Sequence, residues 1–163
     1  FKKNYLISNF FKVHILDKKK GDSGEILDVQ ELRKNLYNIY KNEKRASTGL
    51  LHLKLSKNNN FIFINEVLKI KRYFSDGLSK NLVYYKAISP NYSVAYEKLL
   101  LDFNLPLIYK IRCFVNINRY YFHGANKIEL SFLNKIMVNI FYFISLIFYI
   151  IDKTKIKKNL KEI

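Results

Sequence analysis

The chain of 163 residues has little of what builds disulfides, zinc sites and glycine-rich phosphate loops. It contains one cysteine, two prolines, five glycines and no tryptophan. The single cysteine, Cys113, excludes an internal disulfide and any zinc site built on a cysteine pair. Because Cys113 lies in the apolar segment 111–115, we expect it to be a small buried side chain. The sequence has no glycine-rich phosphate loop of the GxxxxGK type.

Acidic residues and histidines are also scarce. The chain has 13 Asp and Glu against 29 Lys and Arg, and its three histidines, His14, His52 and His123, are far apart in the sequence. A nuclease that uses two metal ions needs a repeated acidic pair, and none is present. We therefore expect no enzyme: no catalytic residue, no metal site, no cofactor and no small-molecule substrate. The histidines are expected at the surface or facing RNA.

The chain is rich in basic residues, and its formal net charge of +16 predicts a polyanionic partner. Residues 1–49 contain 11 basic and 6 acidic side chains, residues 50–135 contain 13 and 5, and residues 136–163 contain 5 and 2. Charge spread in this way favours a protein that nucleic acid surrounds on several faces. Lys, Asn, Ile, Leu, Phe and Tyr, which AT-rich codons specify, dominate the composition. This bias indicates a genome under AT pressure, such as a mitochondrial or plastid genome, with an AT-rich nuclear or bacterial genome as the alternative.

Hydrophobic spacing predicts an α/β domain preceded by an extension. Residues 1–48 are expected to form an N-terminal extension with one amphipathic helix over 27–43, whose apolar residues share a stripe. Residues 49–152 are expected to form the main domain, and residues 153–163 a basic C-terminal tail. Within the main domain, strands are predicted over 50–56, 61–64, 67–74 and 107–115, helices over 91–103 and 125–140, and a last strand that ends at Ile151. This order of elements is typical of a mixed α/β fold.

An apolar run from Ile136 to Ile151 allows two interpretations. It has 16 residues, and Lys135 and Asp152 close it on either side. A membrane-spanning helix needs about 20 apolar residues, with roughly 17 as a lower limit. We therefore expect the run to be the end of a helix followed by a buried strand. A membrane span, with flanking Tyr and Lys residues as interfacial anchors, is the alternative.

Four short segments carry motifs in a fixed order: 49–64, 75–79, 86–90 and 152–159. Together these segments resemble the S-eleven family of small-subunit ribosomal proteins. The family opens with G-h-x-H-h, then F-N-N and a second strand, and segment 49–64 with His52 and Asn58-Asn59 is similar in order and spacing. Segments 75–79 and 86–90 correspond to the family's glycine-containing loop and basic helix entry. The family's last motif, D-x-T-P-I-P-H-N-G, is similar to DKTKIKKN at 152–159, where lysines replace both prolines.

The resemblance implies a ribonuclease H-like fold, a mixed five-stranded sheet flanked by helices. It implies a structural constituent of an organellar small ribosomal subunit, which binds small-subunit rRNA at the platform, near the mRNA exit and beside neighbouring small-subunit proteins. The expected location is the mitochondrial matrix. The family's G-P-G-x-G-R loop is replaced by the longer segment 116–124, where only Gly124 is a glycine and Arg119 remains as a basic residue.

The predicted RNA-binding residues are the basic, amide and hydroxyl side chains of these motifs and of the loops beside them. They are Lys54, Lys57, Asn58, Asn59, Asn60, Lys80, Lys86, Ser89, Arg119, Lys153, Thr154, Lys155, Lys157, Lys158 and Asn159. Such side chains bind phosphate and ribose, with an affinity that falls steeply as salt is raised. The main alternative is a single-pass membrane subunit of an organellar inner-membrane respiratory complex. A nuclease on the same fold is a third interpretation, which the scarcity of acidic residues disfavours.

Overall fold

The computed structural model describes residues 4–18, 25–67, 70, 72 and 81–159, with side chains described as far as residue 157. It divides into two compact units. Unit 1 comprises residues 1–38 and 48–75, and unit 2 comprises residues 39–47 and 76–163. The short segment 39–47 therefore belongs to the same unit as the C-terminal half of the chain.

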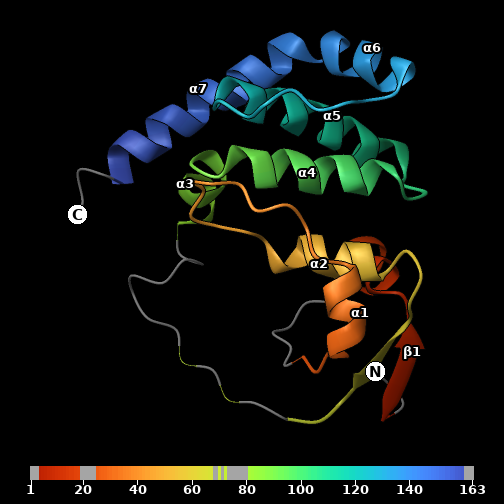
Figure 1. Cartoon of the computed structure of the whole chain (residues 1–163). Coiled ribbons are helices and arrows are strands. Elements are labelled where there is room, and N and C mark those ends of the chain that lie inside the picture. The colour runs from red at the N-terminus through yellow and green to blue at the C-terminus, as the bar shows by residue number, and fades with distance from the viewer. Residues whose placement is uncertain (1–3, 19–24, 68–69, 71, 73–80, 160–163) are drawn as a thin grey trace. The chain divides into compact units, whose positions relative to one another are not determined.

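Unit 1 combines a two-stranded antiparallel sheet with short helices (Figure 1). Its elements are β1 (Tyr5–Ser8), the π-helix η1 (Phe11–Leu16), α1 (Val29–Lys34), α2 (Thr48–Leu55) and β2 (Phe61–Ile64). Strands β1 and β2 are antiparallel, with Tyr5 opposite Ile64 and Ser8 opposite Phe61. Helix α1 starts at Asp28, whose carboxylate accepts hydrogen bonds from the backbone N–H groups of Gln30 and Glu31.

Aromatic rings and one amide connect the N-terminal segment of unit 1 to α2 and β2. The ring of Phe10 lies 4.6 Å from that of His52 and 5.7 Å from that of Phe61, measured between centroids. The side chain of Asn9 donates to the backbone carbonyl of Ser56. Offset ring pairs of this kind stabilise a core by more than the area they bury. The contacts of Asn9 and Phe10 hold β2 beside β1, although the two strands are far apart in the sequence.

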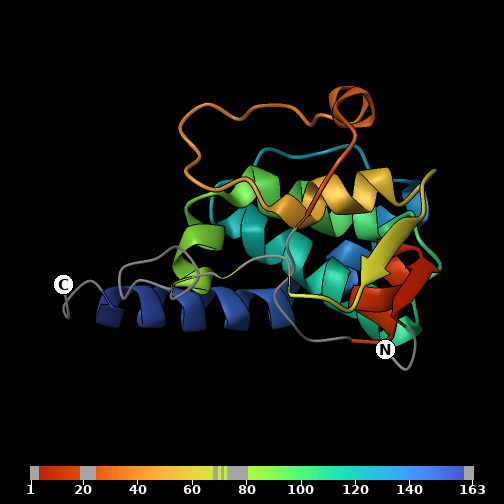
Figure 2. The same ribbon diagram turned by 90° about the horizontal axis from the view of Figure 1, so that it is seen from below.

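Unit 2 is a bundle of helices built around α5. Its helices are α3 (Leu82–Ala87), α4 (Pro90–Leu101), α5 (Leu107–Phe122), α6 (Phe132–Ile140) and α7 (Tyr142–Asn159). Helix α5 packs against α4, α6 and α7, and α3 packs against α4 and α7. Two views show the C-terminal half of α7 extending beyond α5 (Figure 1, Figure 2). Buried Phe114 and Ile117 of α5 pack with Val138 of α6 in the core of this unit.

The predicted ribonuclease H-like fold with a five-stranded sheet is wrong. The described residues are mainly helical and contain a single two-stranded antiparallel sheet. Strand 61–64 is confirmed as β2, and the helix expected over 91–103 is confirmed as α4, which begins at Pro90 and ends at Leu101. Of the strand predicted over 67–74, residues 68–69, 71 and 73–74 lie outside the described residues, and residues 67, 70 and 72 are not part of a strand.

Two segments predicted as strands are helices, because their apolar residues fit both periods. The segment 50–56 lies in and just after α2, where Leu50 and Leu53 are buried three residues apart. Leucine is a strong helix former, and this segment has none of the β-branched residues that favour strands. The segment 107–115 is the first half of α5. Its buried face continues through Ile117 and Tyr120, across the predicted loop 116–124, because Asn116 and Asn118 are buried rather than turn residues.

The predicted last strand is also helical, and forms the first half of α7. An apolar run without periodicity does not distinguish a buried strand from a helix, and the length of this run favours a helix. The helices predicted over 27–43 and 125–140 are shorter than expected, since α1 covers Val29–Lys34 and α6 covers Phe132–Ile140.

Among the described residues, single helices and the pair α6 and α7 give different answers to the question whether a helix could span a membrane. None of their helices is by itself long and apolar enough to cross a bilayer. Taken together, α6 and residues 142–157 of α7 meet the length and composition required, although the two helices are bent by 61° at their junction.

The packing of α5 predicts a large difference between two isoleucines of the same helix. Ile117 is fully buried, whereas Ile108 is 70% exposed. We expect Ile117→Ala to lower the free energy of unfolding by about 2–5 kcal/mol and Ile108→Ala to change it by less than about 0.5 kcal/mol. Urea unfolding followed by circular dichroism measures both. Equal losses in the two variants would contradict the assignment of Ile117 to the core.

Candidate nucleic-acid interface

In unit 1, the turn that joins α2 to β2 carries the first group of predicted RNA-binding residues. Lys57, Asn58 and Asn60 are exposed. Lys54 is partly buried, and its Nζ donates to the backbone carbonyl of Leu36 over 2.9 Å. The side-chain nitrogen of Asn59 donates to Glu31 Oε2 over 3.3 Å. The turn therefore presents one cation and two amides to solvent, while Lys54 and Asn59 fasten it to its own unit.

The C-terminal half of α7 carries the second group. Lys153, Thr154, Lys155 and Lys157 are exposed, and none of the three lysines forms an ion pair with another described residue. The Thr154 hydroxyl donates to the carbonyl of Ile150 over 2.9 Å, as is common for threonine in a helix. Lys158 and Asn159 belong to the same helix, and their side chains lie outside the described residues. The helix holds these lysines at fixed spacing.

Arg119 lies in the interior of unit 2, where it joins α5 to α7. Its Nε and Nη2 donate to the two carboxylate oxygens of Asp152, which is 2% exposed. Nε2 of His123 lies 3.1 Å from Asp152 Oδ2, and Arg119 Nη1 donates to Asn116 Oδ1 over 3.3 Å. A guanidinium that binds a carboxylate through two parallel hydrogen bonds has fixed geometry and strong attraction. The structure thus assigns Arg119 a role in helix packing, and its contact with RNA stays a prediction.

These partners set the ionisation of Asp152. Burial of the carboxyl group acts to raise its pKa, but the hydrogen bonds from His123 and Arg119 and the positive charge of Arg119 outweigh it, so the pKa of Asp152 is lowered. The carboxylate stays ionised in the folded protein at a pH where it would be protonated in the unfolded chain.

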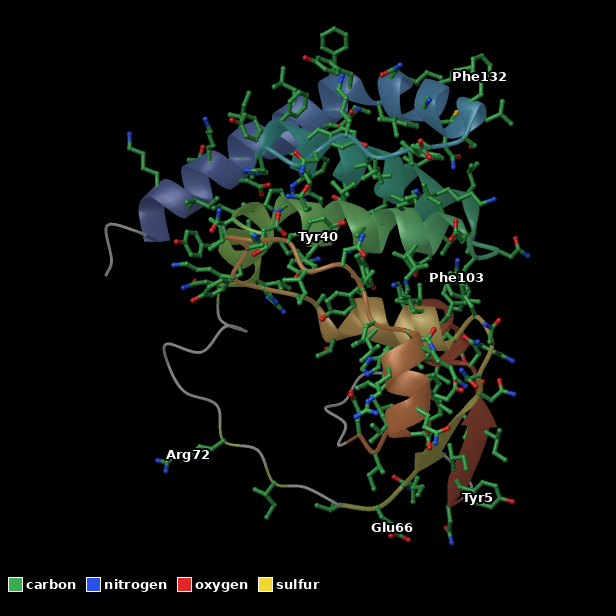
Figure 3. The ribbon with its side chains drawn as sticks, in the orientation of Figure 1. Tyr5, Tyr40, Glu66, Arg72, Phe103 and Phe132 are labelled. Atoms are coloured by element: carbon green, nitrogen blue, oxygen red, sulfur yellow. The ribbon has the colours of Figure 1, made fainter. Side chains whose placement is uncertain are left out.

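Segment 39–47 is fixed against the start of α4. Glu43 accepts hydrogen bonds from the backbone N–H groups of Asn91 (2.7 Å) and Tyr92 (3.0 Å) at the N-terminus of α4, where a negative charge is favourable. The ring centroids of Tyr40 and Tyr92 lie 4.9 Å apart, and Figure 3 shows Tyr40 beside α4. The buried Ser89 hydroxyl accepts from the backbone N–H of Arg45 over 2.9 Å. Ser89, a predicted RNA-binding residue, therefore positions Arg45.

Lys86 lines a pocket in unit 2, whose wall includes the buried Glu97 of α4. Asn116 donates to Glu97 Oε1 over 2.9 Å. Burial raises the pKa of Glu97, against the opposing effects of the Lys86 charge and of hydrogen bonds from Cys113 and Asn116. Burial also lowers the pKa of Lys86, against the attraction of Glu97. The pocket is thus a poorly hydrated site that contains opposite charges.

Sequence reasoning missed Glu43, Arg45, Glu97 and Asp152 as interacting residues. A signal was present for Glu97, because it lies three residues from both Val94 and Leu100 on the apolar stripe of α4. A charged residue on a buried helix face requires a partner. No comparable local signal existed for Glu43, which acts on a helix almost fifty residues away.

The predicted residues fall into separate groups. Lys54 and residues 57–60 belong to unit 1. In unit 2, Lys86 lies in α3, Ser89 lies directly before α4, and Arg119 lies in α5. The end of α7 carries Lys153, Thr154, Lys155 and Lys157. Lys80 lies outside the described residues.

Among the described residues, no three His, Cys, Asp or Glu side chains are placed to hold a metal ion. No protein family, curated protein or solved structure matches this chain.

The lowered pKa of Asp152 predicts a pH-dependent contribution to stability. Because the folded pKa lies below the unfolded value of about 3.9, the contribution is complete above that value and is lost as the pH falls through the folded pKa. We expect Asp152→Asn to lower the unfolding free energy at pH 7 by about 3 kcal/mol, because it leaves the Arg119 charge without its partner. We also expect the variant to lose less stability than the parent between pH 5 and pH 2.

The measurement is urea unfolding at a series of pH values from 7 down to 2. Glu129→Gln, an equivalent change at an exposed carboxylate of unit 2, is the control, and we expect it to follow the parent. If Asp152→Asn followed the parent at every pH, the ion pair would make no contribution to stability.

Proposed function

We propose that the chain is an RNA-binding structural protein of the small subunit of an organellar ribosome, without catalytic activity. The observation that carries the proposal is the row of exposed lysines at the end of α7, Lys153, Lys155 and Lys157. Lys153 and Lys157 lie one helical turn apart, so their ammonium groups reach the same side of the helix. This part of α7 extends beyond α5 (Figure 2), and the three lysine side chains on it are exposed.

The electrostatics of α7 and of the whole chain support this proposal. The net charge of +16 favours a polyanionic partner, which would relieve the self-repulsion of the compact chain. Each phosphate that a lysine neutralises releases counterions, so affinity falls with salt. Lysines in the last turns of a helix also stabilise it through the helix dipole. Stabilisation through the helix dipole affects protein stability and not RNA binding. Measurements of stability and of RNA binding therefore separate the two roles of these lysines.

The motif resemblance supplies the ribosomal part of the proposal. The exposed Lys57, Asn58 and Asn60 of the turn between α2 and β2 correspond to one of the four similar segments, and 153–159 to another. Amide side chains donate to phosphate oxygens and sugar hydroxyls, which suits RNA. The fold that the resemblance implied is not part of the proposal, because the helices of unit 2 replace it.

A second candidate function, a membrane-attached subunit, is favoured by the outer face of α6 and α7. Phe132 and Phe143 are each 76% exposed, and Figure 3 shows Phe132 directed away from the helices. Other exposed apolar side chains on these two helices are Leu133, Ile136, Ile140, Ile144, Ile147, Phe148, Ile150 and Ile151. Contiguous exposed apolar area of this kind marks a contact with protein or lipid. A neighbouring ribosomal protein or an acyl phase would cover it.

The α7 lysines predict a change in the salt dependence of RNA binding. We expect replacement of Lys153, Lys155 and Lys157 by glutamine to reduce the slope of log Kd against log salt by about 2, since each contact with single-stranded RNA contributes about 0.7. Fluorescence anisotropy with a labelled fragment of small-subunit rRNA, measured between low and high salt, gives the slope.

Two controls accompany the triple variant. Replacing the same lysines by arginine keeps the charge and should keep the slope. Replacing the exposed Lys41, Lys44 and Lys127, which form no row on one helix, should reduce it less. An unchanged slope in the α7 glutamine variant would remove the observation on which the RNA-binding proposal rests.

Cell fractionation separates the two candidate functions. A ribosomal protein co-sediments with small subunits and leaves the membrane fraction in alkaline carbonate. Retention in the carbonate-washed membrane pellet, with none in the ribosomal fraction, would favour the membrane-attached subunit and contradict the ribosomal proposal.

A further inference from the structure

A pocket of about 220 Å³ lies within unit 2, between α3, α4, α5 and segment 39–47. Its wall contains three cationic side chains, Arg45, Lys86 and Arg112, and one carboxylate, Glu97. The remaining lining residues are Ser47, Leu82, Tyr92, Ser93, Tyr96 and Tyr120. Pockets for drug-sized ligands measure about 300–1,000 Å³, so this one suits a smaller group. Its chemistry is basic and rich in hydroxyl donors.

The charge of the pocket is not balanced by its own residues. Three cations converge on one carboxylate, and the charge of Arg119 acts on Lys86 as well. Burial lowers the pKa of Lys86, and the charges of Arg112, Arg45 and Arg119 lower it further, so the ammonium group is destabilised by its surroundings. An anion bound among these groups would reverse that effect, because opposite charges attract strongly where water is scarce.

One donor in the pocket wall is without a partner. Nη1 of Arg45 is buried and has no hydrogen-bond partner among the described residues. A buried donor left unsatisfied is destabilising, and more so when it is charged, so such a group indicates a missing acceptor. Arg45 is also held in place, since its backbone N–H donates to Ser89 and Glu43 fixes the same segment to α4.

We propose that this pocket binds a phosphate monoester, with Arg45, Arg112 and Lys86 on its oxygens. A phosphate group offers several acceptor oxygens and about two negative charges, which match three cations, an unpaired guanidinium nitrogen and the tyrosine and serine hydroxyls. The volume admits a phosphate and a small substituent such as a ribose. The phosphate belongs either to a free nucleoside monophosphate or to the 5′ end of an RNA.

The site goes beyond the surface contacts of the proposed function, because it recognises a single terminal phosphate in a pocket. In the proposed function the lysines of α7 neutralise phosphates along an RNA strand. These lysines do not line the pocket. The two ideas therefore make separate predictions and fail separately.

The test is isothermal titration calorimetry of the full chain with four probes. The probes are uridine 5′-monophosphate, uridine, and an RNA hexamer with either a 5′-phosphate or a 5′-hydroxyl. We expect at least one phosphorylated probe to bind about tenfold or more tightly than its unphosphorylated partner, which corresponds to the loss of one charge-assisted hydrogen bond. Preference for the monophosphate indicates a free nucleotide as the source, and preference for the phosphorylated hexamer indicates an RNA end.

Variants assign the binding to the pocket. Arg45→Gln and Arg112→Gln should each weaken binding of the phosphorylated probe about tenfold, whereas Arg33→Gln on the exposed surface of α1 should leave it within about twofold. Glu97→Gln, which removes the only carboxylate of the wall, should tighten binding. The α7 lysine-to-glutamine variant should retain binding of uridine 5′-monophosphate.

Three results would overturn the proposal. One is equal binding of phosphorylated and unphosphorylated probes, or binding of neither. The second is an equal loss in Arg33→Gln and Arg112→Gln, which would indicate general attraction to a basic protein. The third is weaker binding by Glu97→Gln in a variant whose circular dichroism matches that of the parent. Loss of the α7 salt effect alone would contradict the proposed function and leave the pocket intact.

Discussion

The ion pair between Arg119 and Asp152 is the constraint on which the arrangement of unit 2 depends. It links the middle of the bundle, α5, to the centre of α7 through two hydrogen bonds, and His123 adds a third contact to the same carboxylate. A buried pair of this kind adds little net stability over an apolar contact, but it fixes one register of two helices, because any other register leaves a charge buried alone. We infer that it determines where α7 lies along α5. That position in turn decides which residues of α7 face solvent.

Unit 2 distributes polarity in an unusual way. Polar groups lie inside it, including Glu97, Asn116, Asn118 and Asp152, while phenylalanines and isoleucines of α6 and α7 lie outside. A protein that works alone in water has little reason to expose so much apolar surface. The same helix that carries this surface ends in a run of exposed lysines. Helix α7 therefore combines an exposed apolar face with a basic end, and this combination is the basis for proposing that it contacts other molecules in a larger assembly.

Sequence reasoning predicted some elements correctly and assigned others to the wrong type of secondary structure. Phe61–Ile64 and the helix after Pro90 were predictable, because a short β-rich run and a proline at a helix start act locally. Segments 50–56 and 107–115 were not, since the apolar residues there satisfy both the strand and the helix period. Asn116 and Asn118 suggested a loop, yet they are buried and bonded to Glu97 and to the carbonyl of Val138. The basic residues of the pocket come from three separate segments, and only tertiary structure brings Arg45, Lys86 and Arg112 together.

The central claim is that the basic end of α7 contacts RNA while its apolar first half is covered by protein. Ultraviolet crosslinking of intact organelles followed by mass spectrometry tests it directly. The account predicts nucleotide adducts of small-subunit rRNA on the peptides that contain Lys153 to Lys157. Adducts to lipid on residues 142–151, with no nucleotide adduct anywhere on α7, would contradict it.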